Sequence, residues 1–186
     1  FHDKKLDRLT NTQGYIENLD YDSIKKIRVK GKYKIPTLNE VIELIEGNAF
    51  LNIELKGSGT AGPTHKLLTS FIEQKKWMAN QFIISSFNWE ELEIFYKLNQ
   101  KIPIAILTGS DPLDAINTAK RLNALAINPN FKTLNLKNVK KIQKEGFKVF
   151  PYTINNMKDI EEMLNLEVDG IITDFPERVK KVLSSN

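Results

Sequence analysis

The residues KVFPYTINNMKDIEEMLNLEVDGIITD, at positions 148–174, contain the pattern that decides the fold. They begin with the short apolar and aromatic run 148–153, continue with the amphipathic stretch 157–166, and end with a second apolar run, 170–174. The two runs are typical of strands, and the stretch between them has the apolar spacing of a helix. Strand, helix and strand in succession predict two parallel strands joined by a helical crossover.

The same alternation extends back to about residue 37 and predicts an α/β fold. Thr37 followed by Glu40 is a capping-box signature for the first helix. Six strands and seven helices with this spacing fit either a doubly wound open sheet or a TIM-type (β/α) barrel that lacks its first two strand–helix units. No glycine-rich phosphate fingerprint follows any strand, which disfavours the dinucleotide-binding sheet. The other predicted strands are 50–55, 81–87, 102–107 and 124–129, and the other helices start at 37 or cover 63–76, 89–99, 112–123, 137–145 and 176–183.

Length and composition indicate one globular domain, 1–186, with an ordinary mixture of 41% hydrophobic and 27% charged residues. Residues 1–36 are polar and turn-rich, and we expect them to form a loop excursion over the active-site mouth, with the alternating units in 37–186. The chain has no cysteine, which excludes disulfides, thiolate metal ligands and a cysteine nucleophile.

The charge pattern does not indicate a nucleic-acid partner. The formal net charge is +4, but the lysines are spread over many segments. Their short clusters at 25–28 and 137–148 are more typical of solvated helix faces, with a mild preference for anionic substrates or membrane surfaces as a second interpretation. The longest apolar runs are too short to cross a bilayer, so we expect no integral membrane segment. Because the first residue is Phe1, an upstream signal can be missing; a cytoplasmic location is slightly favoured, with a secreted or membrane-associated one left open.

Polar residues lie at the ends of several predicted strands. In an α/β barrel the carboxyl ends of the strands converge on one mouth, so these side chains are expected to face one site. They are Glu54 with Lys56, Ser85 with Ser86, Asn128, Thr153 with Asn155, and Thr173 with Asp174.

Glu54 and Lys56 are two residues apart on one strand and therefore point to the same side of it. One interpretation is an ion pair at a strand end. The other is a metal-binding carboxylate beside a phosphate-binding ammonium, because Mg and Ca prefer oxygen ligands and an anionic phosphodiester needs neutralisation in its transition state. One carboxylate alone makes a poor metal site, and the sequence shows no obvious second partner.

Other candidate residues have equally open interpretations. His2, next to Asp3, can be a tail residue or a functional one, and His65 is predicted to be a surface residue of a helix. Tyr152 and Phe87 can be core packing, or aromatic walls against a polyol or alcohol group at the mouth.

Several motifs, in order along the whole chain, resemble the glycerophosphodiester phosphodiesterase family. Phe1-His2-Asp3 with Leu6-Asp7-Arg8 and Thr10-Asn11 resembles the family's second histidine motif, and 51–56 resembles its metal-ligand strand. The segments 35–41, 84–87, 151–155 and 168–176 resemble its segment before the next helix and its later strands.

The resemblance implies an α/β barrel that hydrolyses glycerophosphodiesters to glycerol 3-phosphate and an alcohol. By analogy, His2 is one half of a histidine acid/base pair, and Glu54 ligates a divalent cation, Mg or Ca. Lys56 binds a phosphate oxygen, and Phe87 and Tyr152 lie near the substrate. A small-molecule glycerophosphodiester is then the expected partner.

The chain also departs from the family pattern. The family's first strand with His-Arg-Gly, its Glu-Asn-Thr and its Glu-Leu-Asp are absent, and they would supply the partner histidine, an arginine and two metal carboxylates. Leu9 replaces a common threonine, and Tyr152 a common tryptophan. We therefore expect a barrel that starts partway, whose open edge another copy of the chain could cover as a homo-oligomer. Two alternatives remain: a non-catalytic relative that binds phosphorylated glycerol headgroups or a protein partner, and a phospholipid-cleaving relative.

Overall fold

The computed structural model describes residues 1–185, so Asn186, the last residue of the predicted domain, lies outside the described part. The chain forms two compact units, one from Phe1 to Ala49 and the other from Phe50 onward.

The first unit consists of short elements. They are a 3-10 turn (Ile16–Asn18), α1 (Tyr21–Ile24), the antiparallel pair β1 (Arg28–Val29) and β2 (Tyr33–Lys34), and α2 (Leu38–Ile45). The capping box predicted for α2 is confirmed, because Thr37 Oγ1 accepts from the Glu40 N–H at 3.2 Å and the Glu40 carboxylate accepts from the Thr37 N–H at 2.7 Å. Leu6 and Ile42 are fully buried apolar side chains of this unit.

The second unit is a parallel sheet of five strands in the order β3-β4-β5-β6-β7. Helices alternate with the strands, which confirms the predicted α/β class with helical crossovers. Among residues 1–185, β3 and β7 are the sheet's two edges and no pairing closes it into a barrel. The strands are β3 (Leu51–Glu54), β4 (Phe82–Ser86), β5 (Ile104–Thr108), β6 (Ala126–Pro129) and β7 (Lys148–Val149).

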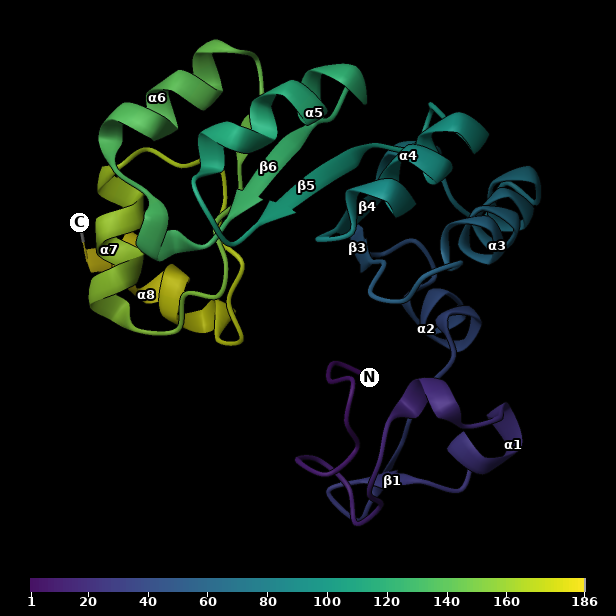
Figure 1. The fold of residues 1–186 in the computed structure, drawn as a ribbon. Coiled ribbons are helices and arrows are strands. Elements are labelled where there is room, and N and C mark those ends of the chain that lie inside the picture. The colour runs from purple at the N-terminus through teal and green to yellow at the C-terminus, as the bar shows by residue number, and fades with distance from the viewer. Residues whose placement is uncertain (186) are drawn as a thin grey trace. The chain divides into compact units, whose positions relative to one another are not determined.

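The helices end within a few residues of the predicted boundaries. Figure 1 shows α5 running beside β5 and β6. No helix within residues 1–185 has the length and apolar character needed to span a bilayer. The helices are α3 (Ala61–Glu73), α4 (Trp89–Leu98), α5 (Ala115–Arg121), α6 (Leu136–Lys144), α7 (Met157–Asn165) and α8 (Pro176–Ser185), with 3-10 turns at Ala79–Gln81, Pro112–Asp114 and Phe131–Thr133.

The two faces of the sheet differ in chemistry. One face carries apolar side chains such as Phe82, Ile104 and Val149, which are buried with apolar residues of the helices. Strand register places Asn52 beside Ile83, Glu54 beside Ser85, and Leu107 beside Asn128 on the opposite face. The polar residues of the candidate site therefore belong to the face that the main core does not use.

The predicted strand 170–174 is not a regular strand. Asp169 and Ile172 donate their backbone N–H groups to the carbonyls of Val149 and Pro151, at 3.1 and 2.9 Å. These donors are three residues apart and their acceptors two, so the segment carries an extra residue and the ladder loses its register. β7 ends at Val149, before the predicted 153, although Phe150 and Tyr152 still donate their N–H groups to the Ile127 and Pro129 carbonyls at 3.2 and 3.1 Å. Pro129 of β6 has no N–H to donate in return, so the ladder is incomplete there.

Candidate functional site

The polar edge of β3 is the centre of the candidate site. Glu54 and Lys56 point to the same face, as predicted, and the Lys56 Nζ lies 3.6 Å from Glu54 Oε1. The side chains are 30% and 37% exposed, so both reach solvent at the open face. An ion pair with this exposure contributes only about 0–1 kcal/mol to stability. Stability alone therefore does not explain why these two charged residues lie at this position.

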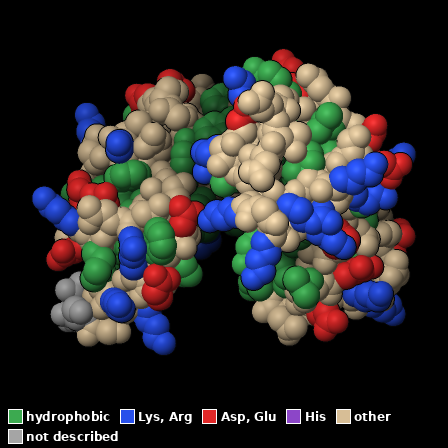
Figure 2. Space-filling view, turned by 90° about the horizontal axis from the view of Figure 1, so that it is seen from below, with side chains coloured by type: hydrophobic (Ala, Val, Ile, Leu, Met, Phe, Trp, Pro, Cys, Tyr) green, Lys and Arg blue, Asp and Glu red, His purple; other side chains and the backbone are tan. Residues whose placement is uncertain are grey.

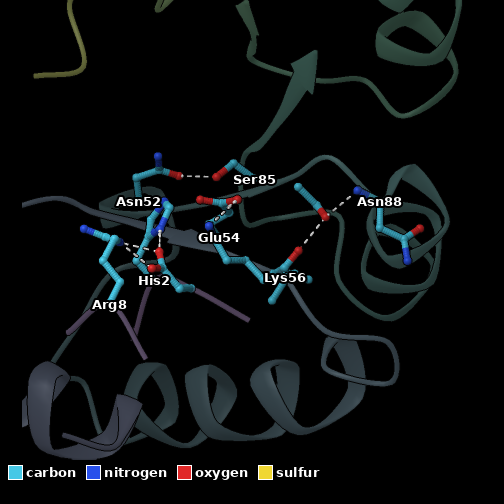
Figure 3. Close-up of polar contacts among 10 residues, drawn as sticks. His2, Arg8, Asn52, Glu54, Lys56, Ser85 and Asn88 are labelled. Carbon is cyan, nitrogen blue, oxygen red and sulfur yellow. Dashed lines mark hydrogen bonds and ion pairs between the residues drawn. The ribbon is translucent and has the colours of Figure 1, made fainter. Parts of the chain in front are cut away.

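The neighbouring strand β4 supplies two buried hydroxyls that point in opposite directions. Ser85 lies beside Glu54 in the register, and its Oγ is 2.8 Å from Asn52 Oδ1 (Figure 3). Ser86 points away from the site face and donates to the Leu55 carbonyl at 2.6 Å. The prediction that both serines face one site is therefore wrong for Ser86, because side chains alternate along a strand.

Phe87 and Tyr152 form an aromatic pair beside these groups. Their ring centroids are 5.5 Å apart at an interplanar angle of 90°, an edge-to-face contact. The Tyr152 hydroxyl donates to the Thr108 carbonyl at 3.0 Å, which fixes the ring over the end of the sheet. Phe87 is 51% exposed, so the pair presents an apolar surface to solvent.

The protonation of Tyr152 links the aromatic pair to Glu54. Burial raises the pKa of the Tyr152 hydroxyl, and the negative charge of Glu54 raises this pKa further. Glu54 lies beside Ser85 in the register, and Phe87 is two residues past Ser85, so side-chain alternation places Glu54, Lys56 and Phe87 on one face of the sheet. The ring contact adds Tyr152 to this group.

His2 belongs to the first unit and is described within it. The Asp3 carboxylate contacts His2 Nδ1 at 2.6 Å and accepts from Arg8 Nε at 2.5 Å and from a second Arg8 nitrogen at 2.8 Å. Hydrogen bonds from Arg8 and then from His2 hold the pKa of Asp3 well below its usual range. A carboxylate on one ring nitrogen orients an imidazole, which is the arrangement that an acid/base histidine needs.

Three of the polar residues predicted at the other strand ends, Asn155, Thr173 and Asp174, bond to one another. The Asn155 side chain bonds with Thr173 Oγ1, with the Asp174 N–H and with the Asp174 carboxylate, at 3.1, 3.0 and 2.8 Å. Asn128 is buried on the site face, and its Oδ1 has no hydrogen-bond partner within the described part of the chain. His65, predicted to be a surface residue, is half-buried with its ring edge-on to Phe95 at 6.2 Å, because its helix face packs on α4.

Sequence reasoning missed two residues of this region. Asn52 shares the side-chain alternation of Glu54 and Lys56, so the same argument would have found it. Glu91 is buried on α4 and bonds to the loop after β3, a contact over 30 positions that no local pattern indicates.

A divalent cation would need more oxygen ligands than this site shows. Within residues 1–185, no group of three or more His, Asp and Glu side chains could hold a metal ion. Glu54 is one carboxylate, and Mg or Ca takes six or more oxygen ligands. The described residues therefore do not by themselves form a complete metal site.

Comparisons with known proteins agree on one family. The sequence model of the glycerophosphoryl diester phosphodiesterase family matches residues 1–178. The glycerophosphodiester phosphodiesterase of Caldanaerobacter subterraneus subsp. tengcongensis is 34% identical over 186 residues, covering 95% of this chain and 76% of that protein. The one from Bacillus altitudinis is 32% identical over 197 residues, covering 97% and 78% of the two chains.

Solved structures show the same likeness. An Oleispira antarctica phosphodiesterase in complex with the product sn-glycerol-3-phosphate has a TM-score of 0.87 and 25% identity, covering 99% of this chain and 78% of that one. A Parabacteroides distasonis glycerophosphodiester phosphodiesterase has a TM-score of 0.80 and 26% identity, covering 100% and 77%. With the family model matching nearly the whole sequence, this chain belongs to the glycerophosphoryl diester phosphodiesterase family.

Proposed function

We propose that this protein hydrolyses glycerophosphodiesters to glycerol 3-phosphate and an alcohol. The observation that carries the proposal is the Glu54–Lys56 pair, on the same open sheet face as the Phe87–Tyr152 pair. This face offers a cation, a carboxylate and an apolar wall in one place. A glycerophosphodiester has an anionic phosphate between two carbon-bearing groups, which is the chemistry that such a face suits.

Lys56 is the residue proposed to bind a phosphate oxygen. Its ammonium is partly exposed, so it can reach a ligand while Glu54 lies 3.6 Å away. Positive charge at the phosphate stabilises the negative charge that develops in the transition state. Phe87 and Tyr152 would pack against the carbon atoms of the glycerol or alcohol group, because aromatic faces and edges bury apolar surface well.

His2 is the proposed acid/base residue. Water adds to phosphorus, the bond from phosphorus to the alcohol oxygen breaks, and a proton goes to that leaving oxygen. A histidine can deliver this proton or take one from the attacking group, because its pKa lies near neutrality. The Asp3 carboxylate at Nδ1 would hold the imidazole in the orientation for this transfer.

Glu54 is proposed to supply one oxygen ligand to a divalent cation, Mg or Ca. Such a cation, when bound, neutralises charge on the phosphodiester. The fact that the relatives are phosphodiesterases supports the class of reaction, while the cation requirement rests on the resemblance and on the presence of this carboxylate.

Release of glycerol 3-phosphate from glycerophosphoethanolamine tests the proposal. The assay measures release by the chain, and by any longer form that its gene encodes, each with Mg, Ca or a chelator. Metal-dependent release by either form is the expected result. In parallel, melting with and without each cation should show a rise in Tm wherever a usable cation site exists.

The contradicting outcome is release by neither form, when the form tested is folded and its melt shows bound cation. This outcome would favour a non-catalytic relative that binds phosphorylated glycerol headgroups or a protein partner. Titration with glycerol 3-phosphate, read by the shift in Tm, would then separate headgroup binding from no binding.

A further inference from the structure

A buried carboxylate on α4 holds the loop that follows Lys56. Glu91, in the first turn of α4, is only 3% exposed. Its side chain accepts from the Gly59 N–H at 2.6 Å and from the Ala61 N–H at 2.8 Å, and it lies 3.4 Å from Thr60 Oγ1. These donors lie at the amino end of α3, about 30 positions earlier in the chain.

The Glu91 carboxylate accepts the hydrogen bonds that an N-cap side chain of α3 would ordinarily accept. Thr60, the N-cap residue, makes no side-chain cap; its hydroxyl donates back to the Gly57 carbonyl at 2.8 Å. The first N–H groups of a helix need acceptors, and a negative charge is favourable at that end. Burial raises the pKa of Glu91, but the hydrogen bonds from Gly59, Ala61 and Thr60 outweigh burial and hold this pKa below its usual value.

A second buried side chain holds the chain on the other side of Lys56. Ser86, fully buried on β4, donates to the Leu55 carbonyl at 2.6 Å and accepts from the Asn88 N–H at 2.9 Å (Figure 3). The backbone is therefore attached to the β4–α4 segment one residue before Lys56 and again from Gly59 onward. Gly59 has a φ of +76°, a left-handed conformation that suits the sharp path between these attachments.

We propose that Ser86 and Glu91 are positioning residues that hold the Lys56 ammonium at the phosphate site. The inference rests on the proposed function, because it assigns these residues a role through Lys56. Capping of α3 alone would require only the Glu91 bonds. To fix the position of Lys56, the backbone has to be attached on both sides of it, at Leu55 and at Gly59. A displacement of about 1 Å at a substrate-positioning group can cost about 100-fold in rate.

A double-mutant cycle in the form that shows activity tests the proposal. Glu91→Gln keeps the size of the side chain but turns one acceptor into an NH₂ group that faces N–H donors. We expect Glu91→Gln to lower kcat/KM about 10- to 100-fold and to weaken glycerol 3-phosphate binding, read by the shift in Tm. In a Lys56→Met background the same change should have little further effect, because the residue that it positions is already gone.

A matched control separates positioning from capping. Asn135 caps α6 by accepting from the Asn138 N–H at 3.0 Å, with no contact to the Lys56 loop. Asn135→Ala should lower Tm while kcat/KM, measured well below Tm, stays unchanged. If Glu91→Gln does not fold, Ser86→Ala takes its place in the cycle, since it removes one hydrogen bond at Leu55 and leaves the helix cap.

Two outcomes overturn the positioning role alone: full activity of the folded Glu91→Gln or Ser86→Ala variant, or a loss that multiplies with that of Lys56→Met. A parent protein that neither releases nor binds glycerol 3-phosphate overturns the proposed function and this inference together. The two failures are therefore distinguishable.

Discussion

The two edges of the second unit's sheet are built in different ways. At one edge β3 pairs with β4 residue for residue, from Leu51 opposite Phe82 to Glu54 opposite Ser85. At the other edge β7 stops after Val149, and its pairing with the segment 169–172 loses register. Both edges end in polar residues, but only at the β3 edge are polar side chains available to contact a substrate.

The difference lies in what holds each edge. Regular pairing fixes the direction of every side chain on β3, so Glu54 and Lys56 share one face while buried Ser86 and Glu91 attach the following loop. The irregular edge is held by side chains instead. Asn155 bonds to Thr173 and Asp174, and the Asp169 carboxylate accepts from the Val149 N–H at 2.9 Å and from the Gln143 amide at 3.1 Å. Polar residues at a strand end therefore indicate a site only where the backbone does not need them.

On the face seen in Figure 2, Lys and Arg side chains are interspersed with Asp and Glu side chains and gather in no single stripe. This distribution fits the interpretation of the lysine clusters as solvated faces, since binding of a nucleic-acid backbone requires concentrated positive charge. The absence of a nucleic-acid partner remains a prediction.

Removal of the charges at the regular edge should give the largest effect. Lys56→Met keeps the apolar stem and removes the ammonium, and Glu54→Gln removes the carboxylate charge. We expect each variant to lower kcat about 100- to 1,000-fold, as for loss of an electrostatic contact to a transition state. Stability should change by no more than about 1 kcal/mol, because the pair is partly exposed. Steady-state kinetics and thermal melts measure the two quantities.

The control is Lys97→Met, which removes an exposed lysine at the end of α4 and should leave both kcat and Tm unchanged. A Lys56→Met variant that keeps more than a third of the parent kcat would show that the two edges do not differ in function. The β3 and β7 edges would then differ in architecture alone.

Removal of a side-chain bond at the irregular edge should affect stability instead. Asn155→Ala deletes the acceptor of Thr173 Oγ1 and of the Asp174 N–H, at 3.1 and 3.0 Å. The expected loss is about 1–3 kcal/mol, from about 0.5–1.5 kcal/mol for each of the two lost hydrogen bonds, and the free energy of unfolding in urea measures it.

Its neighbour Asn156 provides the comparison, because it caps α7 by accepting from the Lys158 N–H at 3.0 Å but makes no bond across the edge. Asn156→Ala should cost about 1 kcal/mol. An Asn155→Ala loss no greater than that of Asn156→Ala would contradict the view that side chains hold this edge.

Much of this architecture was predictable from residue patterns. Apolar periodicity predicted the helices and the parallel class, and the capping box at Thr37 and Glu40 was visible directly. Side-chain alternation alone places Glu54 and Lys56 on one face of the strand. These features are local, so short stretches of sequence contain their cause.

The features that sequence did not predict depend on distant contacts. Pro151 removes a ladder donor, but whether the chain then breaks or bulges depends on the partner segment. Gly170 shows the crowding there, since a Cβ at this position would lie 2.9 Å from the Phe150 ring. Glu91 has the local pattern of an ordinary first-turn acid of α4, and only folding brings it to the amino end of α3.

The smallest expected effect is at Tyr152, which follows the β7 edge and contacts Phe87 after β4 and Thr108 at the end of β5. Tyr152→Phe removes the hydrogen bond to the Thr108 carbonyl but keeps the ring against Phe87. We expect a loss of about 1 kcal/mol at neutral pH, or about 2–4 °C in Tm, with kcat nearly unchanged because the apolar wall remains. Thermal melts and the phosphodiesterase assay measure these quantities.

The pH dependence gives this prediction its sharper form. The pKa of Tyr152 is raised in the folded protein by burial and by Glu54, so folding favours the protonated hydroxyl. Its contribution to stability is fully present below the unfolded pKa of about 10, and it is lost as the pH rises through the higher folded pKa. The parent protein should therefore lose its advantage over Tyr152→Phe in melts above about pH 10. If kcat instead falls tenfold in Tyr152→Phe at neutral pH, the Tyr152 hydroxyl itself takes part in the reaction. Residues outside the β3 edge would then also contribute to catalysis.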